Sequence, residues 1–393
     1  MKLIVQKFGG SSISNVRKIV NVAKIITNVY DSQTNVLVVV SAQGDTTDWL
    51  INKMFSVNPK PSKREMDVLM SVGEQISIAL LTSYINSFGV PAVSLTGWQA
   101  GIYTDDVYGN ARIKHIDNRR ILRELNERKI VIVAGFQGVD EENNITTLGR
   151  GGSDTSAVAL AVSLKADICQ IYTDVDGVYT ADPRLVKKAK KIEEITFDEM
   201  LEMSSLGAKI LHNRSVELAK NHNLELDVRS SFSHKPGTRV KEEVNVERGA
   251  VRGIACDDSI SLIKIKQYED DVYDTISILE KNNIVVSAIS INKISQNENE
   301  ISLVVPKDKI SDVKLLLDFK QYVIKDHVTK VSIIGAGLMS NPMVLSRLFK
   351  VLSENNIKQH LILTGEITIS IIVDSNEAVN IMNELHDEYN LFR

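Results

Sequence analysis

The stretch Val5-Gln-Lys-Phe-Gly-Gly-Ser-Ser12 decides the fold, because it joins an apolar strand to a helix through a pair of glycines. Apolar residues 3–5 predict the strand, and the apolar spacing over 16–29 predicts an amphipathic helix. Such a turn leaves backbone N–H groups open to an anion, and Lys7 adds a positive charge beside them. The Walker pattern is absent, so the stretch indicates either a different phosphate cradle or a plain βα turn.

The length and composition limit the classes of protein. A chain of 393 residues with 43% hydrophobic residues, 24% charged residues and a net charge of −4 is expected to hold two or three globular domains. This charge balance argues against nucleic acid and against an anionic membrane as partners. The two distant cysteines, Cys169 and Cys256, and the lack of a long apolar stretch at the start favour a reducing cytoplasm.

Strand and helix patterns alternate as far as about residue 230, which predicts a doubly wound three-layer αβα sandwich. Unbroken apolar runs, of which 35–40 is the clearest, are typical of parallel strands buried on both faces. The polar loop 41–48 follows that run, at the end of the strand where open α/β sheets bind ligands. A single helix is expected over 64–88, and it contains Gly73-Glu74. Further strands are expected at 90–95, 130–134 and 166–173.

A second glycine cluster, TTLGRGGSDTS at 146–156, precedes an Ala/Val/Leu helix and forms a stronger anion cradle than the first. Arg150 can bind a carboxylate or a phosphate through two parallel hydrogen bonds. Taken alone, Arg150 would be a surface ion-pair partner and Asp154 a helix N-cap. Two glycine-rich cradles in one α/β domain favour an anion site over these readings.

A third cluster, YTDVDGVYTADPR at 172–184, lies at the end of a predicted strand and contains the turn signal Asp176-Gly177. It is interpreted as a nucleotide pocket in which Tyr179 contacts a base and Arg184 lies near phosphates. The alternative is a solvated loop whose carboxylates face water and whose tyrosine only packs.

The C-terminal part holds a repeat that begins after a turn-rich and charged boundary at about 240–250. Each repeat reads β-α-β-β with one further helix, and the Asn-Ile pairs at 283–284 and 356–357 mark equivalent positions. This pattern predicts two ferredoxin-like modules. The glycines of Gly335-Ala-Gly337 resemble a dinucleotide fingerprint, but the third glycine and the later acidic residue are missing, so a turn is favoured.

Together these clusters resemble aspartate kinase, of the single-function type that carries two ACT modules after an amino-acid-kinase domain. The resemblance covers nearly the whole chain, and TTLGRGGSD together with TDVDGVYTADPR is highly specific. It implies a catalytic domain at 1–245, a first ACT module at 246–328 and a second at 329–393. The matching stretches are KFGGSS (7–12), VVVSAQGDTTD (38–48), VGEQ (72–75), TTLGRGGSDTSAVALA (146–161), YTDVDGVYTADPR (172–184), SSLGAKILHNR (204–214) and VSIIGAGLMSNP (331–342).

The implied reaction is phosphoryl transfer from MgATP to the side-chain carboxylate of L-aspartate, which gives 4-phospho-L-aspartate and ADP. In the family this step opens the routes to lysine, threonine, methionine and diaminopimelate. A carboxylate nucleophile is ionised at pH 7 and needs no general base, so positioning and charge neutralisation are expected to supply the catalysis. Magnesium is expected to be carried by the ATP phosphates, with no metal site built from the protein.

The resemblance also implies residue roles. Lys7 would neutralise the phosphoryl oxygens, Arg150 would clamp the α-carboxylate of aspartate, and Glu74 would pair with its α-ammonium. Without the family, Glu74 would be read as a solvated helix carboxylate and Lys209 as an exposed helix lysine. The catalytic set is Lys7, Arg150 and Asp154. The aspartate side holds Ser41, Thr47, Glu74, Arg150, Gly151, Gly152 and Ser153. The ATP side holds Lys7, Phe8, Gly9, Gly10, Ser11, Thr173, Asp174, Tyr179, Arg184 and Lys209.

Departures from the family pattern concern local structure and regulation. Ser11 stands where the family usually has threonine, and Asn213 replaces a proline, which puts the local turn in question. The stretches 283–292 and 356–366 also differ, so effector recognition is expected to be altered or lost. Lysine is the first candidate effector and threonine the second. Exposed sheet edges of the ACT modules predict a homodimer or a higher homo-oligomer.

Three rival interpretations stay open from the residues alone. A kinase for acetylglutamate or glutamate would share the sandwich but lack the ACT pair and the Glu74 segment. A catalytically inactive amino-acid sensor would not need the charged set of Lys7, Glu74, Arg150 and Asp154. A nicotinamide enzyme would depend on the incomplete fingerprint at 335–337.

Overall fold

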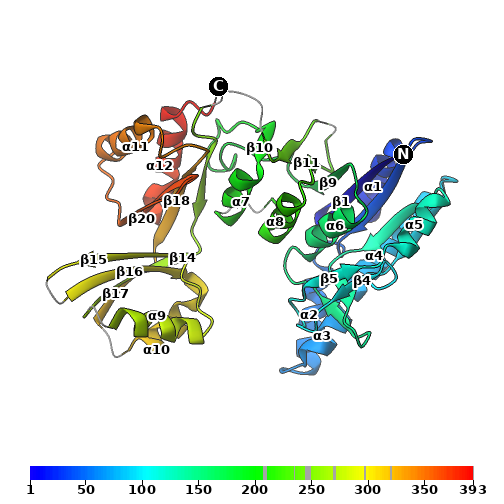
Figure 1. Ribbon diagram of the computed structural model, residues 1–393, viewed down its shortest axis with the longest axis horizontal. Helices are drawn as coiled ribbons and strands as arrows, with labels where there is room; N and C mark the ends of the chain where they lie inside the picture. The colour runs from blue at the N-terminus through cyan, green and yellow to red at the C-terminus, as the bar shows by residue number, and fades with distance from the viewer. Residues whose placement is uncertain are drawn as a thin grey trace. The chain divides into compact units, whose positions relative to one another are not determined.

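The computed structural model describes residues 1–206, 210–233, 235–243, 249–268, 271–295, 298–318 and 321–392. The chain divides into two compact units. The first contains Met1–Val178 and Lys191–Val246, and the second contains Tyr179–Lys190 and Glu247–Arg393. Figure 1 shows the helices and strands of both units.

The first unit is built on an eight-stranded sheet in the order β10-β12-β11-β9-β1-β2-β6-β3. Every neighbouring pair is parallel except β11 and β12. In the middle of the sheet, Lys7 on β1 pairs in register with Val39 on one side and Ile171 on the other. The strands are β1 (Lys2–Phe8), β2 (Thr34–Val40), β3 (Ala92–Leu95), β6 (Ile130–Ala134), β9 (Ile168–Thr173), β10 (Glu194–Thr196), β11 (Leu226–Ser230) and β12 (Thr238–Lys241).

Helices cover both faces of this sheet, which confirms the three-layer αβα sandwich. Lys7 and Phe8 are neighbours on β1 and therefore point to opposite faces. Phe8 packs into a core with α1 (Val16–Val29) and α4 (Val72–Asn86), whereas Lys7 meets α6 (Gly152–Ser163). The other helices of this unit are η1 (Gly10–Ile13), α2 (Thr46–Val57), α3 (Lys63–Met70), α5 (Arg119–Asn126), α7 (Phe197–Ser205) and α8 (Asn213–Asn221).

The single helix expected over 64–88 is wrong, because the chain forms α3 and α4 with a break at Ser71. The Ser71 carbonyl oxygen accepts hydrogen bonds from the side chains of Gln75 and Gln137. The combined stretch is apolar and long enough, by composition alone, to cross a membrane. Its most apolar part is 50% buried inside the protein, as in a core helix of a globular fold.

A second sheet of the first unit, in the order β5-β4-β7-β8, leads into the second glycine cluster. β8 contacts α3. The hydroxyls of Thr104 and Thr146 share a buried hydrogen bond of 2.6 Å between β4 and β8. The strands are β4 (Ile102–Thr104), β5 (Ile113–Ile116), β7 (Gln137–Val139) and β8 (Ile145–Thr147).

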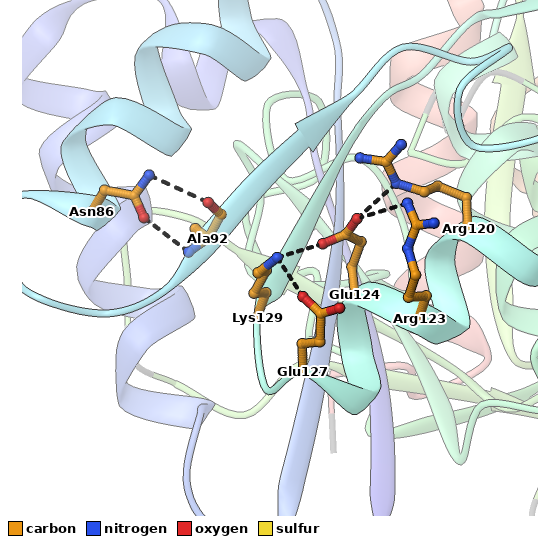
Figure 2. A network of polar contacts seen from close by, with 7 residues as sticks. All are labelled: Asn86, Ala92, Arg120, Arg123, Glu124, Glu127 and Lys129. Carbon is orange, nitrogen blue, oxygen red and sulfur yellow. Dashed lines mark hydrogen bonds and ion pairs between the residues drawn. The ribbon is translucent and has the colours of Figure 1, made fainter.

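Polar contacts fix the connections around α5 and β3 (Figure 2). Glu124 is buried and accepts hydrogen bonds from Lys129 at 2.8 Å and from Arg120 at 2.7 Å. Asn86 closes the turn before β3 through two hydrogen bonds with the backbone of Ala92. This network holds the end of α5 at the start of β6, and it contains none of the predicted site residues.

The second unit contains two four-stranded antiparallel sheets, each packed against two helices, as expected for ferredoxin-like modules. The sheet of the first module has the order β15-β16-β14-β17. Its core includes Ile263, Leu279 and Leu303. Its elements are β14 (Ile260–Tyr268), α9 (Val272–Lys281), β15 (Ala288–Lys293), β16 (Glu298–Pro306), η3 (Lys307–Lys309), α10 (Ile310–Leu316) and β17 (Gln321–Lys325).

The second module takes its edge strand from outside its expected range. Its sheet has the order β13-β18-β20-β19, and β13 (Gly253–Asp257) pairs antiparallel with β18 (Val328–Ile334). The first module is therefore inserted between two strands of the second sheet. The range 246–328 expected for the first module includes this strand, because pairing over such a distance leaves no local sequence signal. The remaining elements are α11 (Pro342–Glu354), β19 (Leu361–Thr364), β20 (Thr368–Asp374) and α12 (Ser375–Glu388).

The segment Tyr179–Lys190 also belongs to the second unit, although it lies within the range 1–245 expected for the catalytic domain. Ala181 and Val186 are buried in the core of the second module. The side chain of Asn383 on α12 donates a hydrogen bond to the Leu185 carbonyl oxygen at 3.2 Å. Apolar anchors spaced along a loop account for this docking.

Gly335 and Gly337 lie in the turn between β18 and α11. A Cβ on Gly335 would lie 1.9 Å from the Ala250 carbonyl oxygen, and the Gly335 N–H donates to the Ile367 carbonyl oxygen at 3.0 Å. The glycine therefore allows two backbones to approach closely. This contact supports the turn interpretation over a dinucleotide site.

Candidate active site

An ion pair joins the two glycine-rich stretches, 5–12 (the first cradle) and 146–156 (the second cradle). Lys7 lies near the end of β1, and Asp154 lies in the first turn of α6. The Lys7 Nζ is 2.7 Å from Asp154 Oδ1, and the two side chains are only 11% and 13% exposed. The structure thus brings together the lysine of the first cradle and the acid of the second, which are far apart in the sequence.

The first cradle is pressed against the loop that follows β2. A Cβ on Gly10 would lie 2.6 Å from the Ala42 carbonyl oxygen, so only glycine fits there without moving one of the loops. The Gly44 N–H donates to the Gly10 carbonyl oxygen at 3.1 Å. Gly9 faces the lysine, since a Cβ on it would lie 3.6 Å from Lys7 Nζ.

The remaining residues of the first cradle are placed differently. Ser11 is exposed. The Phe8 side chain is fully buried and stacks on Tyr172 with ring centroids 4.5 Å apart. Its backbone carbonyl oxygen accepts a hydrogen bond from the Ser41 N–H at 3.1 Å. Phe8 therefore supplies core packing beneath the cradle.

Glu74 is a buried acidic residue in the first turn of α4. Its Oε1 accepts a hydrogen bond from the Ala42 N–H at 2.9 Å, while its Oε2 has no hydrogen-bond partner among the described residues. A Cβ on Gly73 would lie 2.7 Å from the Ala42 Cβ, so the glycine allows this close approach. Burial raises the pKa of Glu74 to about 8, against the opposing hydrogen bond from Ala42. The free oxygen is suited to a cationic ligand.

The other residues predicted on the aspartate side frame the same region. Ser41 follows β2 and Thr47 lies in the first turn of α2, and both are partly buried. Ser153 is buried at the start of α6, where a Cβ on Gly135 would lie 2.8 Å from the Ser153 Cβ. The loops after β2 and β6 and the start of α6 therefore converge.

Arg150 is exposed and makes no hydrogen bond or ion pair with any residue that the structure describes. It stands between Gly149, with φ of 76°, and Gly151, with φ of 68°. A Cβ on Gly151 would lie 2.3 Å from His212, and Gly152 follows it as the first residue of α6. The guanidinium is thus free to take an anionic ligand.

The residues predicted on the nucleotide side belong to both units of the chain. Thr173 ends β9, and its hydroxyl donates to Asp174 Oδ1 at 3.1 Å. Tyr179 and Arg184 belong to the second unit, where Arg184 pairs with Asp182 at 2.6 Å. Lys209 lies outside the described residues.

Two charged residues near the second cradle were missed by the sequence interpretation. Asp67 on α3 has no exposed surface, and Arg214 on α8 is half-buried with its pKa lowered by burial. Arg214 stands inside the motif SSLGAKILHNR, which is the only signal that could have found it. Asp67 reads in the sequence as an ordinary helix carboxylate.

Asn213, which stands where the family has proline, occupies the first position of α8. Proline suits this position because its N–H would be unpaired there in any case. In this chain the Asn213 side chain donates a hydrogen bond to the Ser205 hydroxyl at 2.6 Å. The turn is therefore kept by a side-chain contact instead of a fixed backbone angle.

Comparison with known proteins gives a consistent class. The sequence pattern of the amino acid kinase family matches residues 2–230, and that of the ACT domain matches residues 331–389. The aspartokinase of Geobacillus stearothermophilus is 47% identical over 100% of this chain and 98% of its own length. E. coli aspartokinase III in complex with aspartate and ADP has a TM-score of 0.83 at 24% identity, covering 98% of this chain and 99% of that chain. The same enzyme in complex with lysine and aspartate has a TM-score of 0.79 at 25% identity, covering all of both chains.

These observations define a class of protein: an amino acid kinase domain followed by ACT modules. Identity of 47% over the whole length then narrows the class. The chain belongs to the aspartokinase family, and the expected kinase activity class and fold are confirmed.

Proposed function

We propose that this enzyme transfers the terminal phosphoryl group of MgATP to the side-chain carboxylate of L-aspartate, giving 4-phospho-L-aspartate and ADP. The observation that carries this proposal is the Lys7–Asp154 pair, 2.7 Å apart. It holds a nearly buried ammonium group where two glycine-rich loops offer backbone N–H groups. The 47% identity with a known aspartokinase, over the whole length of this chain, supports the choice of substrate.

Lys7 acts on the charge of the transferring group. Two anions must approach each other in this reaction, and a fixed cation in a site with little water lowers that barrier. Asp154 holds the lysine side chain in one place before ATP arrives. One Cα hydrogen of Gly9 faces the same ammonium group, so a phosphoryl oxygen can reach both Lys7 and the backbone.

The amino-acid end of aspartate is held by opposite charges. The unpaired guanidinium of Arg150 binds the α-carboxylate, and the free Oε2 of Glu74 receives the α-ammonium. A buried carboxylate with a raised pKa gains most from such a partner, because the cation restores its ionised form. Ser41, Thr47 and Ser153 complete the pocket by hydrogen bonding.

Magnesium enters as part of the MgATP substrate. Among the residues described, no group of three or more His, Cys, Asp or Glu side chains is arranged to hold a metal ion. On the nucleotide side we assign Gly10, Ser11, Thr173 and Asp174 from the first unit. The nucleotide roles of Tyr179, Arg184 and Lys209 stay predictions from the family resemblance, because the first two belong to the second unit and Lys209 lies outside the described residues.

The test is ATP-dependent acyl-phosphate formation trapped with hydroxylamine, with L-aspartate, L-glutamate and acetylglutamate compared at equal concentrations. Turnover with aspartate alone is expected. Turnover with glutamate or acetylglutamate instead would assign a different amino acid kinase reaction. A folded protein that binds ATP but turns over none of the three would favour an amino-acid sensor.

Feedback regulation through the ACT modules is the second part of the proposal. An ACT domain matches residues 331–389, and an aspartokinase structure with lysine bound matches the whole chain. Lysine is therefore the first candidate effector and threonine the second. The trapping assay repeated with each amino acid, and with both together, tests this assignment directly. We also propose that the reaction takes place in the cytoplasm, on the routes to lysine, threonine, methionine and diaminopimelate.

A homodimer through the first ACT module is the third part. β15 is an edge strand of its sheet, and Ile289 and Ile291 on it are 45% and 50% exposed. They pair in register with the buried Leu303 and Ile301, so they continue the apolar face of the sheet to its open edge. A second copy of this strand would pair the free backbone groups of the edge and extend the sheet, with its apolar side chains beside these isoleucines.

A further inference from the structure

We infer that Asp67 and Arg214 are positioning residues for aspartate binding, because together they fix the loop that carries Arg150. This inference rests on the proposed role of Arg150 as the clamp for the α-carboxylate. Neither residue is among the predicted site residues, and the two come from different helices, α3 and α8.

Asp67 collects three hydrogen bonds from two segments of chain. Its Oδ2 accepts from the Thr147 N–H at 2.8 Å and from the Gly109 N–H at 2.9 Å, and its Oδ1 accepts from the Thr147 hydroxyl at 2.8 Å. Thr147 is the last residue of β8, just before the glycine-rich loop. The buried carboxylate thus ties the start of that loop to the turn at Gly109.

Arg214 makes the complementary contacts to the same two segments. Its guanidinium donates to the Leu148 carbonyl oxygen at 3.1 Å and to the Ala111 carbonyl oxygen at 2.8 Å. A direct backbone bond from the Ala111 N–H to the Thr147 carbonyl oxygen, 2.9 Å long, joins the segments between the two side chains. Asp67 therefore binds N–H groups of the two segments, and Arg214 binds their carbonyl oxygens.

The loop around Arg150 needs the contacts with Asp67 and Arg214 because it is rich in glycine. Gly149 and Gly151 flank Arg150 with positive φ, and glycine loses more backbone freedom on ordering than any other residue. Fixing Thr147 and Leu148 on one side and α6 on the other leaves only three residues to be ordered. Order that is established before substrate arrives lowers the cost of binding, and a displacement of about 1 Å can cost about 100-fold.

The experiment measures kcat and both KM values for Arg214→Met, Arg214→Lys and Thr147→Val in the full chain. Arg214→Met removes both donors but keeps the length of the side chain. It is expected to raise KM for aspartate about tenfold or more, with kcat and KM for ATP changed less than about twofold. Arg214→Lys should be intermediate. Thr147→Val removes a single hydrogen bond and should give a smaller rise of the same kind.

Two controls separate positioning from stability. Glu124→Gln disturbs another buried charge network (Figure 2) and should lower the melting temperature without changing KM for aspartate. In the background of Arg150→Ala, Arg214→Met should cause no further rise in KM for aspartate, since Arg214 acts through Arg150. Additive effects in that double variant, or a fall in kcat with both KM values unchanged, would overturn the inference. Wild-type turnover with aspartate in the same assay tests the proposed function separately.

Discussion

The ion pair of Lys7 with Asp154 lies at the centre of the proposed site. Both side chains are nearly buried, and neither has another charged partner among the residues that the structure describes. Removing the lysine would leave a carboxylate facing the incoming phosphates. The pair is therefore expected to matter for turnover more than for folding.

Lys7→Ala is predicted to lower kcat by about 100-fold or more, as for other groups that stabilise charge in a transition state. Steady-state kinetics and a thermal melt provide the measurement. Lys18→Ala is the matched control, because Lys18 contacts the same cradle through the Ser11 carbonyl oxygen. Near wild-type turnover of the Lys7 variant would contradict the proposed role.

Glu74 predicts a pH dependence of aspartate binding. Its pKa of about 8 means that it is mostly protonated at pH 7, whereas the α-ammonium group requires the ionised form. KM for aspartate should therefore fall as pH rises from 6 to 8, by about tenfold per unit below pH 7, and level off above 8.

Glu74→Gln tests the same group without a titratable carboxyl. Its KM for aspartate should be high and independent of pH between 6 and 8. The raised pKa also means that the stability supplied by the protonated form is lost as pH rises from about 4.5 to about 8. The melting temperature of the variant relative to wild type should therefore be higher at pH 8 than at pH 5. A pH-independent KM in the wild type would disprove this linkage.

Sequence motifs pointed to the charged residues of the proposed site but not to Asp67 and Arg214, which contact the loop that carries Arg150. Lys7, Arg150 and Asp154 stand in glycine-rich stretches whose chemistry can be read locally. Asp67 has its partners 42 and 80 residues away, so no local pattern distinguishes it from an exposed helix acid.

Among the elements, the start of α6 depends on a backbone turn that only glycine makes easily. Gly151 has φ of 68°, and a Cβ there would meet His212 at 2.3 Å. The turn allows α6 to point its N–H groups toward the meeting place of the cradles. Substitution therefore combines backbone strain with a steric clash.

Gly151→Ala is predicted to destabilise the protein by about 2 kcal/mol or more and to raise KM for aspartate. Gly89→Ala is the matched control. Gly89 also has positive φ, at 75°, but nothing lies within 4 Å of the position that a Cβ would take there, so strain alone of about 1 kcal/mol is expected. Chemical denaturation of both variants gives the comparison. Equal losses would show that the clash with His212 is unimportant.

Most elements could be predicted from the sequence because their signals are local. The period of apolar residues gave the bounds of α1, and the unbroken apolar run gave β2. The break at Ser71 was missed, because it depends on a hydrogen bond from Gln137, which is 66 residues away. The pairing of β13 was not predicted for the same physical reason, since its partner β18 follows a whole module later.

For the whole molecule, the exposed edge of β15 predicts self-association. Ile291→Lys places a charge on the apolar face beside that edge, which should prevent pairing with a second copy. Light scattering at micromolar concentration should then show a dimer or larger for wild type and a monomer for the variant. Lys293→Glu, a charge change on the same strand, is the control. A monodisperse wild-type monomer would refute the homodimer.

The placement of β13 before the first module and of β18 after it has a consequence for protein synthesis. All elements of the first module come from one uninterrupted stretch, so it can fold as soon as that stretch leaves the ribosome. β13 cannot pair until β18 has been synthesised, which takes on the order of ten seconds at ordinary translation rates. Nascent chains halted between the two strands should therefore carry a finished first module and an unpaired β13, a natural target for chaperones.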